Sequence, residues 1–208
     1  MSTVAAKGYR EGRWSRAVRV KRSGAVLEPA YAFDVTVPPG KSVQAAVDAC
    51  PPGGCVLLLP GTHNGPLALA AGKVVHVFGR GRATLRTAAG DVISSAAAAS
   101  TLDGLIVRTD AHTAGDGHFG IFITAGKLRV QACDVSSQSR SGIRVEGPTA
   151  DPFIVDCRVH HCARAGISLF DGCQGTVKDC TCVYSLLGAW EGVQVPIFVA
   201  ADAFILYG

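Results

Sequence analysis

Four side chains that could carry or exchange protons lie within one polar segment, Thr109–Phe119 (TDAHTAGDGHF). They are Asp110, His112, Asp116 and His118. Carboxylates and imidazoles bind polar ligands and take part in acid–base chemistry near neutral pH. A loop set on a rigid scaffold often carries function, so a ligand site is expected here sooner than elsewhere in the chain, although an ordinary surface loop is the favoured interpretation.

Three arginines form a second candidate binding site. Arg140 and Arg164 each stand two residues before a Gly-Ile pair, and Arg144 follows the first of these pairs. Guanidinium groups in a row can hold a carboxylate, sulfate or phosphate of a ligand or partner. A row of solvated surface side chains is the favoured interpretation, and ligand binding is the alternative to it.

The remaining acids and histidines do not predict a catalytic residue or a metal site. Asp134 occupies the position that Arg158 fills in the next copy of a repeat, which predicts a surface ion pair between these two side chains. The segment His160–Cys162 follows Cys157, but this spacing matches no four-ligand zinc set. The chain has no phosphate-binding glycine loop and no nucleophile elbow, so we predict no cofactor.

An internal repeat defines the elements that position these side chains. Segment Lys127–Ala150 aligns without a gap on Asp151–Gln174, so cysteines, valines and Gly-Ile pairs recur about 24 residues apart. Each copy contains short runs of alternating apolar and polar residues separated by turn residues, which is typical of strands. Such a unit cannot bury its apolar face alone, so the copies must stack. The sequence predicts an all-β, right-handed, single-stranded parallel β-helix of about six coils, each of roughly 22–28 residues.

Stacking also predicts which side chains recur inside the coils. Equivalent residues of successive copies should lie one above another at the strand spacing of about 4.8 Å. The two expected inward ladders are Cys133, Cys157 and Cys180, and Ile121, Ile143 and Ile167.

A short capping helix is predicted ahead of the first coil. Ser42 can cap a helix over residues 43–49, and Pro51–Gly54 can end it. This helix would protect the open edge of the first coil. The chain then divides into a basic N-terminal arm (residues 1–38), the β-helix (39–192) and an apolar C-terminal tail or partial last coil (193–208).

The charge distribution limits partners and location. The net charge is +4, and residues 1–22 contain seven basic residues against one acid. Such an arm could be an organelle-targeting segment, an arm for an anionic partner or a solvated tail. We expect no secretory signal, no membrane span and no nucleic-acid partner, and we favour an intracellular location in which the eight cysteines stay reduced.

Two stretches carry a family resemblance. SVQAAVDACPPGGCVLLLPGTH (residues 42–63) resembles the opening of pectin-lyase-like β-helix proteins. DPFIVDCRVHHCARAGISLFDGCQGTVKDCTCV (residues 151–183) resembles the β-helix region of the F-box/β-helix substrate receptors and the related Shc-SH2-binding spindle protein. The resemblance covers about residues 40–192 and implies the fold, and we expect no F-box within the basic residues ahead of the helix. Because this fold hosts lyases, hydrolases, carbohydrate binders and protein scaffolds, the resemblance does not define an activity.

The leading hypothesis is a non-enzymatic β-helix repeat protein that presents a binding surface to a protein or a glycan. The first alternative is a carbohydrate-active enzyme, a polysaccharide lyase or glycoside hydrolase, acting on an acidic polysaccharide. The second is a truncated fragment of a longer β-helix protein, suggested by the lack of an evident C-terminal cap. An enzyme should place at least two acids and one Arg or Lys in a groove, whereas a scaffold should show scattered charges.

Overall fold

The computed structural model describes residues 32–110 and 118–183, together with six two-residue strands outside these ranges. The chain divides into two units, Met1–Ala32 and Phe33–Gly208. The first unit contains two antiparallel strand pairs, β1 (Ala5–Ala6) with β4 (Val18–Arg19) and β2 (Tyr9–Arg10) with β3 (Arg13–Trp14). The second unit holds the coils and every candidate residue that is described below.

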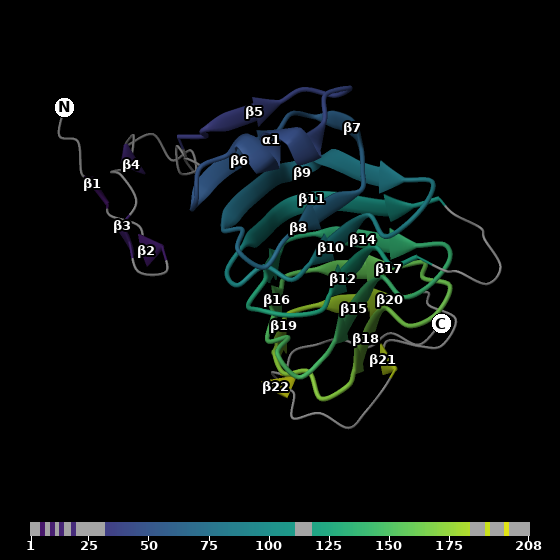
Figure 1. Cartoon of the computed structure of the whole chain (residues 1–208). Coiled ribbons are helices and arrows are strands. Elements are labelled where there is room, and N and C mark those ends of the chain that lie inside the picture. Colours follow the sequence, from purple (N-terminus) through teal and green to yellow (C-terminus); the bar gives the residue numbers. More distant parts are fainter. Residues whose placement is uncertain are drawn as a thin grey trace. The chain divides into compact units, whose positions relative to one another are not determined.

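The second unit is a parallel β-helix of about six coils, stacked in chain order (Figure 1), which confirms the predicted fold. Each coil passes through three strand sets. The first set comprises β5 (Val35–Val37), β6 (Gly54–Leu58), the front halves of β9 (Val75–Thr87) and β11 (Thr101–Thr109), β13 (Arg129–Gln131), β16 (Phe153–Val155), β19 (Thr176–Lys178) and β22 (Phe198–Val199). The second set comprises β7 (Gly61–Asn64), the back halves of β9 and β11, β14 (Asp134–Ser137), β17 (Arg158–His160) and β20 (Thr181–Val183). The third set comprises β8 (Leu67–Leu69), β10 (Ile93–Ser95), β12 (Ile121–Ile123), β15 (Ile143–Glu146), β18 (Ile167–Phe170) and β21 (Trp190–Glu191).

A corner in the left-handed conformation separates the first strand set from the second. Ala132 (φ 50°), Asp156 (φ 52°) and Asp179 (φ 53°) occupy this corner in successive coils, and Gly104 (φ 61°) lies at it within β11. Aspartate tolerates this conformation because its short polar side chain can bond locally. Asp156 and Asp179 are therefore exposed turn residues.

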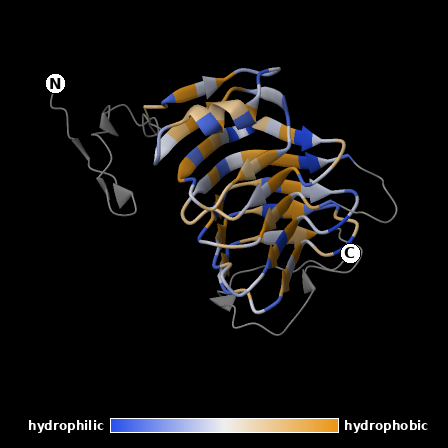
Figure 2. Cartoon of the chain, in the orientation of Figure 1, coloured by the Kyte–Doolittle hydropathy of each residue, from blue (hydrophilic) through white to orange (hydrophobic). Residues whose placement is uncertain are grey.

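The register between coils builds the two predicted inward ladders. Their members are almost fully buried: Ile121, Ile143 and Ile167, and Cys133, Cys157 and Cys180. The Cys157 thiol donates to the backbone carbonyl of Val130 in the preceding coil at 3.5 Å. Figure 2 shows apolar residues along the strands of successive coils. Burial of each such isoleucine contributes about 1.5–3 kcal/mol, so these ladders stabilise the stack.

Helix α1 (Val43–Ala49) covers the first coil, as predicted. The Ser42 hydroxyl accepts a hydrogen bond from the backbone N–H of Ala45 at 3.1 Å, which is the N-cap contact. The Gln44 side-chain amide accepts from the backbone N–H of Ala68 at 2.7 Å and donates to its carbonyl at 3.2 Å. Since β8 is the edge strand of the third set, Gln44 fills the positions at which another strand would pair.

Strand β5 precedes this helix and pairs in parallel with β6. The sheet therefore includes residues ahead of position 39, where the sequence suggested that the β-helix begins.

Candidate functional site

A line of polar side chains follows the outer face of the second strand set. His63, Leu85 and Val107 are fully buried, so alternation directs the residue after each of them outward. These outward residues are Asn64, Arg86 and Arg108, which lie opposite one another in β7, β9 and β11. With the contacting residues Asp110, Asp134 and His160, they form what we call the polar row.

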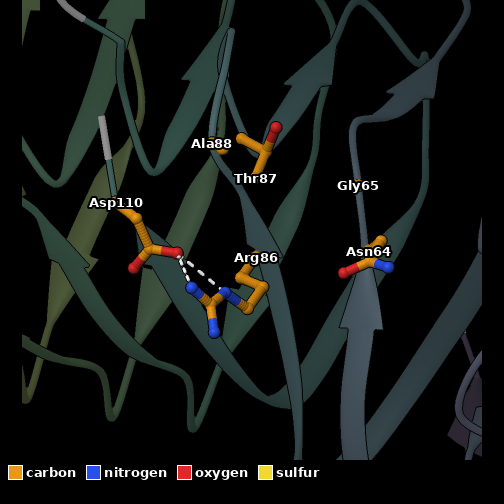
Figure 3. A pocket seen from close by; sticks show the side chains of 6 residues that line it. All are labelled: Asn64, Gly65, Arg86, Thr87, Ala88 and Asp110. Carbon is orange, nitrogen blue, oxygen red and sulfur yellow. Dashed lines mark hydrogen bonds and ion pairs between the residues drawn. The ribbon is translucent and has the colours of Figure 1, made fainter. Parts of the chain in front are cut away.

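The first part of the polar row borders an open cavity. Arg86 Nε donates to Asp110 Oδ2 at 2.7 Å, and Nη2 pairs with the same oxygen. Figure 3 shows Arg86 and Asp110 pointing toward each other, with Asn64 on the neighbouring strand. The cavity has a volume of about 290 Å³ and is lined by Asn64, Gly65, Arg86, Thr87, Ala88 and Asp110. It therefore offers a guanidinium, a carboxylate and an amide to a polar ligand.

Asp134 connects the next coils of the polar row. Arg108 Nη2 pairs with Asp134 Oδ1, and Arg108 Nη1 donates to the Asp134 carbonyl at 2.9 Å. The His160 Nε2 atom lies 2.9 Å from the same Oδ1, and His160 Nδ1 lies 2.7 Å from His161 Nδ1. Partial burial favours the neutral acid, but hydrogen bonds from His160 and Arg108 outweigh it and lower the pKa of Asp134. Asp134 is therefore a fixed carboxylate anion that orients one imidazole.

The ion pair expected between Asp134 and Arg158 requires correction. The two residues are opposite each other in β14 and β17, as the repeat predicted. The carboxylate nevertheless pairs with Arg108 of the preceding coil and with His160. The residue opposite Arg108 is Ser136, which lies two residues after Asp134 in β14. The long Arg108 side chain therefore reaches Asp134 diagonally across the two strands.

Two of the predicted arginines meet aromatic rings at the third strand set. The Arg144 guanidinium carbon lies 3.7 Å from the ring centroid of Phe170 and 5.5 Å from that of Phe119. The Arg140 guanidinium carbon lies 5.6 Å from the Phe119 centroid. Phe119 also contacts Phe122, with ring centroids 5.2 Å apart. We call Phe119, Phe122, Arg140, Arg144 and Phe170 the Arg–Phe cluster.

The remaining predicted site residues lie outside the Arg–Phe cluster. Arg164 is exposed one coil after Arg140, and its backbone N–H donates to the Arg140 carbonyl at 3.3 Å. His118 is half-buried, and its backbone N–H donates to the Ser139 hydroxyl at 2.9 Å. His112 and Asp116 lie outside the described residues. Of the described candidates, Asp110 belongs to the polar row, whereas Arg140 and Arg144 belong to the Arg–Phe cluster.

Arg86 and Arg108 were not among the predicted site residues. A short signal was present, since Leu85–Thr87 (LRT) and Val107–Thr109 (VRT) place an arginine and a threonine after a buried residue in consecutive coils. Aligning these two triplets would have placed both arginines on the outer face.

Across residues 32–110 and 118–183, no three histidine, cysteine, aspartate or glutamate side chains converge as ligands of one metal ion. In the same part of the chain, no helix has the length and apolar character needed to cross a bilayer.

Known proteins share the parallel β-helix architecture of this chain. A protein-family model described as a right-handed β-helix region matches residues 73–189. A mutant pectin methylesterase in complex with a hexasaccharide is 16% identical, with a TM-score of 0.56, covering 72% of this chain and 56% of that one. A second pectin methylesterase–hexasaccharide complex is 13% identical, with a TM-score of 0.58, covering 74% of this chain and 67% of that one.

These similarities are informative at the level of fold. The chain spans little more than half of the first pectin methylesterase structure, and the low identities show a shared fold alone. No curated protein sequence matches the chain. The resemblance to the F-box/β-helix receptors stays a prediction.

Proposed function

Since the chain belongs to the right-handed β-helix family, we propose that it binds an oligosaccharide along the polar row without cleaving it. The observation that supports this proposal is the composition of the row. Arg86 is neutralised by Asp110, and Arg108 by Asp134, in consecutive coils. Each of these arginines therefore contacts a carboxylate of the next coil, so the outer face offers donors and acceptors side by side at the strand spacing of about 4.8 Å.

The neutral character of the row favours hydroxyl groups over anions. A hydroxyl both donates and accepts, so it can bond to a guanidinium and a carboxylate that already hold each other in place. A polyanionic ligand would have to compete with Asp110 and Asp134 for the two arginines. We therefore infer a neutral, hydroxyl-rich glycan, with one of its sugars in the cavity beside Arg86.

Binding without cleavage follows from the protonation state of the carboxyl groups in the polar row. Glycoside hydrolysis by two carboxyl groups needs one of them protonated as a general acid. The Asp134 pKa is lowered, and Asp110 is engaged by Arg86. Burial raises the pKa of Asp103 in spite of the Arg129 charge, but this residue lies in β11 on the first strand set. The polar row is thus arranged to hold a ligand.

A second candidate function is hydrolysis of a glycan at the far end of the row. The contact from Asp134 to His160 Nε2 favours it, because a carboxylate that orients an imidazole is an arrangement used in general-base catalysis. Under this alternative, the adjoining imidazoles of His160 and His161 would accept the one proton that an attacking water loses and deliver it to the leaving sugar oxygen as the glycosidic bond breaks.

Titration calorimetry with neutral oligosaccharides and matched uronides tests the proposal. We expect the full-length chain to bind at least one neutral oligosaccharide with a Kd between about 1 μM and 1 mM, more tightly than the matched uronide. Mass spectrometry of the recovered sugar should show no new product. Binding of uronides alone would overturn the neutral-glycan proposal, and turnover of the bound sugar would favour the second candidate.

A further inference from the structure

The Arg–Phe cluster forms a second outer surface, on the third strand set, that glycan binding at the polar row does not use. We propose that it binds an acidic segment of a partner protein. This inference is independent of the proposed glycan site, because the two surfaces share none of their defining residues.

Aromatic rings give the cluster an apolar floor. Phe119 is 8% exposed, while Phe122 and Phe170 are half-buried and present part of their rings to solvent. Phe122 lies opposite Arg144 in the next coil, so the rings and the guanidinium share one face. Aromatic residues and arginine are enriched at the energetic centres of protein–protein interfaces.

Arg144 holds this face together. Its guanidinium stacks on Phe170 and lies over the ring of Phe119 at a greater distance, and Arg144 Nε donates to Glu146 Oε2 at 2.9 Å. Only 18% of the Arg144 side chain is exposed. Its charge is matched by Glu146, so we assign Arg144 the role of positioning Phe119 and Phe170.

Arg140 is the residue that would recognise the partner. Its guanidinium faces the Phe119 ring, and such stacking leaves the in-plane N–H groups free to bond at their edges. Within residues 32–110 and 118–183, no carboxylate pairs with Arg140, whereas Arg86, Arg108 and Arg144 each have one. A carboxylate is the planar acceptor that fits the edge of a guanidinium in a bidentate manner.

The charge around Arg140 favours an acidic peptide. Glu146 matches the charge of Arg144, whereas the charge of Arg140 has no matching carboxylate within residues 32–110 and 118–183. A neutral glycan would leave the Arg140 charge unmatched. A nucleic acid would engage several phosphates, but the carboxylate of Glu146 is set among these arginines. A segment that alternates acidic and apolar side chains matches both the arginines and the rings.

Fluorescence anisotropy tests the proposal with a labelled peptide of alternating glutamate and leucine. A peptide with glutamine in place of each glutamate is the matched probe. We expect the full-length chain to bind the glutamate peptide and Arg140→Gln to weaken that binding about tenfold or more, because a charge-assisted hydrogen bond is lost. Lys127→Gln removes the same charge at a side chain that is 74% exposed, and should change binding less than about twofold. Added salt should weaken binding to the unsubstituted chain.

Several results would overturn the proposal. These are no binding of the glutamate peptide, equal binding of the glutamine peptide, or equal losses in Arg140→Gln and Lys127→Gln. Self-association that Arg140→Gln abolishes would identify a second copy of this chain as the occupant instead. Circular dichroism should show that Arg140→Gln is folded, and Arg86→Gln should leave peptide binding unchanged.

Discussion

Replacing Asp134 with asparagine is the most specific test of how the polar row is built. Asp134→Asn keeps the shape of the side chain and removes the charge that Arg108 and His160 contact. Hydrogen bonds to charged groups contribute about 1.5–3 kcal/mol, but exposed fractions of 28% for Arg108 and 30% for Asp134 bring solvent screening. We expect the substitution to lower the free energy of unfolding by about 1–2 kcal/mol at pH 7.

The loss of unfolding free energy in Asp134→Asn should become smaller as the pH is lowered. Although partial burial favours the neutral acid, His160 and Arg108 hold the pKa of Asp134 below its usual value of 3.8. An acid with a lowered pKa stabilises the folded state above the unfolded pKa of about 3.9, and this stabilisation disappears as the pH falls through the lower folded pKa. The unsubstituted chain and Asp134→Asn should differ at pH 7 and converge as the pH falls through the lowered pKa of Asp134.

Urea unfolding followed by circular dichroism at several pH values measures both effects. Asp151→Asn is the matched control, because Asp151 is 41% exposed and its partner Lys127 is 74% exposed. This control should change the free energy of unfolding by less than about 0.5 kcal/mol. Equal losses in the two variants, or a loss in Asp134→Asn that persists at low pH, would refute the reasoning.

Three further predictions concern the scaffold. Gln44→Ala should expose the hydrogen-bonding edge of β8 and increase concentration-dependent association, measured by analytical ultracentrifugation; an unchanged monomer fraction would contradict the edge role. Gly142→Ala should lower the free energy of unfolding by about 1–3 kcal/mol in the same urea assay, because the added Cβ would meet Val159 and lie 2.9 Å from the carbonyl oxygen of Gly166. In the control Gly72→Ala, the added Cβ meets nothing within 4 Å, so the free energy of unfolding should not change. Burial raises the pKa of Cys182 to about 12, so this thiol should react with a disulfide reagent at pH 8 only after unfolding, and rapid labelling of the native protein would contradict its burial.

The repeat predicted the fold because equivalent residues recur at a regular spacing along the sequence. Lys127–Gln174 repeats without a gap, and equal coil lengths place equivalent residues one above another. Burial then follows from alternation, so Cys157 and Ile143 could be assigned to the interior from sequence alone. The Ser42 cap was equally local, since it depends on a contact only three residues away.

The candidate sites depended on contacts that the repeat does not encode. Arg86 and Asp110 meet across coils of irregular length, where the cysteine marker of the later copies is missing. Asp134 has Arg158 opposite it in register, yet its contacts run diagonally to Arg108 because side-chain length and direction decide the pairing. Spacing predicts which residues are neighbours along the stack, but it does not predict toward which neighbour a long side chain points.

Binding of a neutral oligosaccharide at the polar row is the central claim. The most direct measurement is calorimetric titration of the oligosaccharide with the unsubstituted chain, Arg86→Gln and Lys127→Gln. Arg86→Gln removes the charge of a guanidinium that lines the cavity, and should weaken binding about tenfold or more. Lys127→Gln should leave the affinity within about twofold of the unsubstituted chain. Equal affinities for all three proteins would contradict the account.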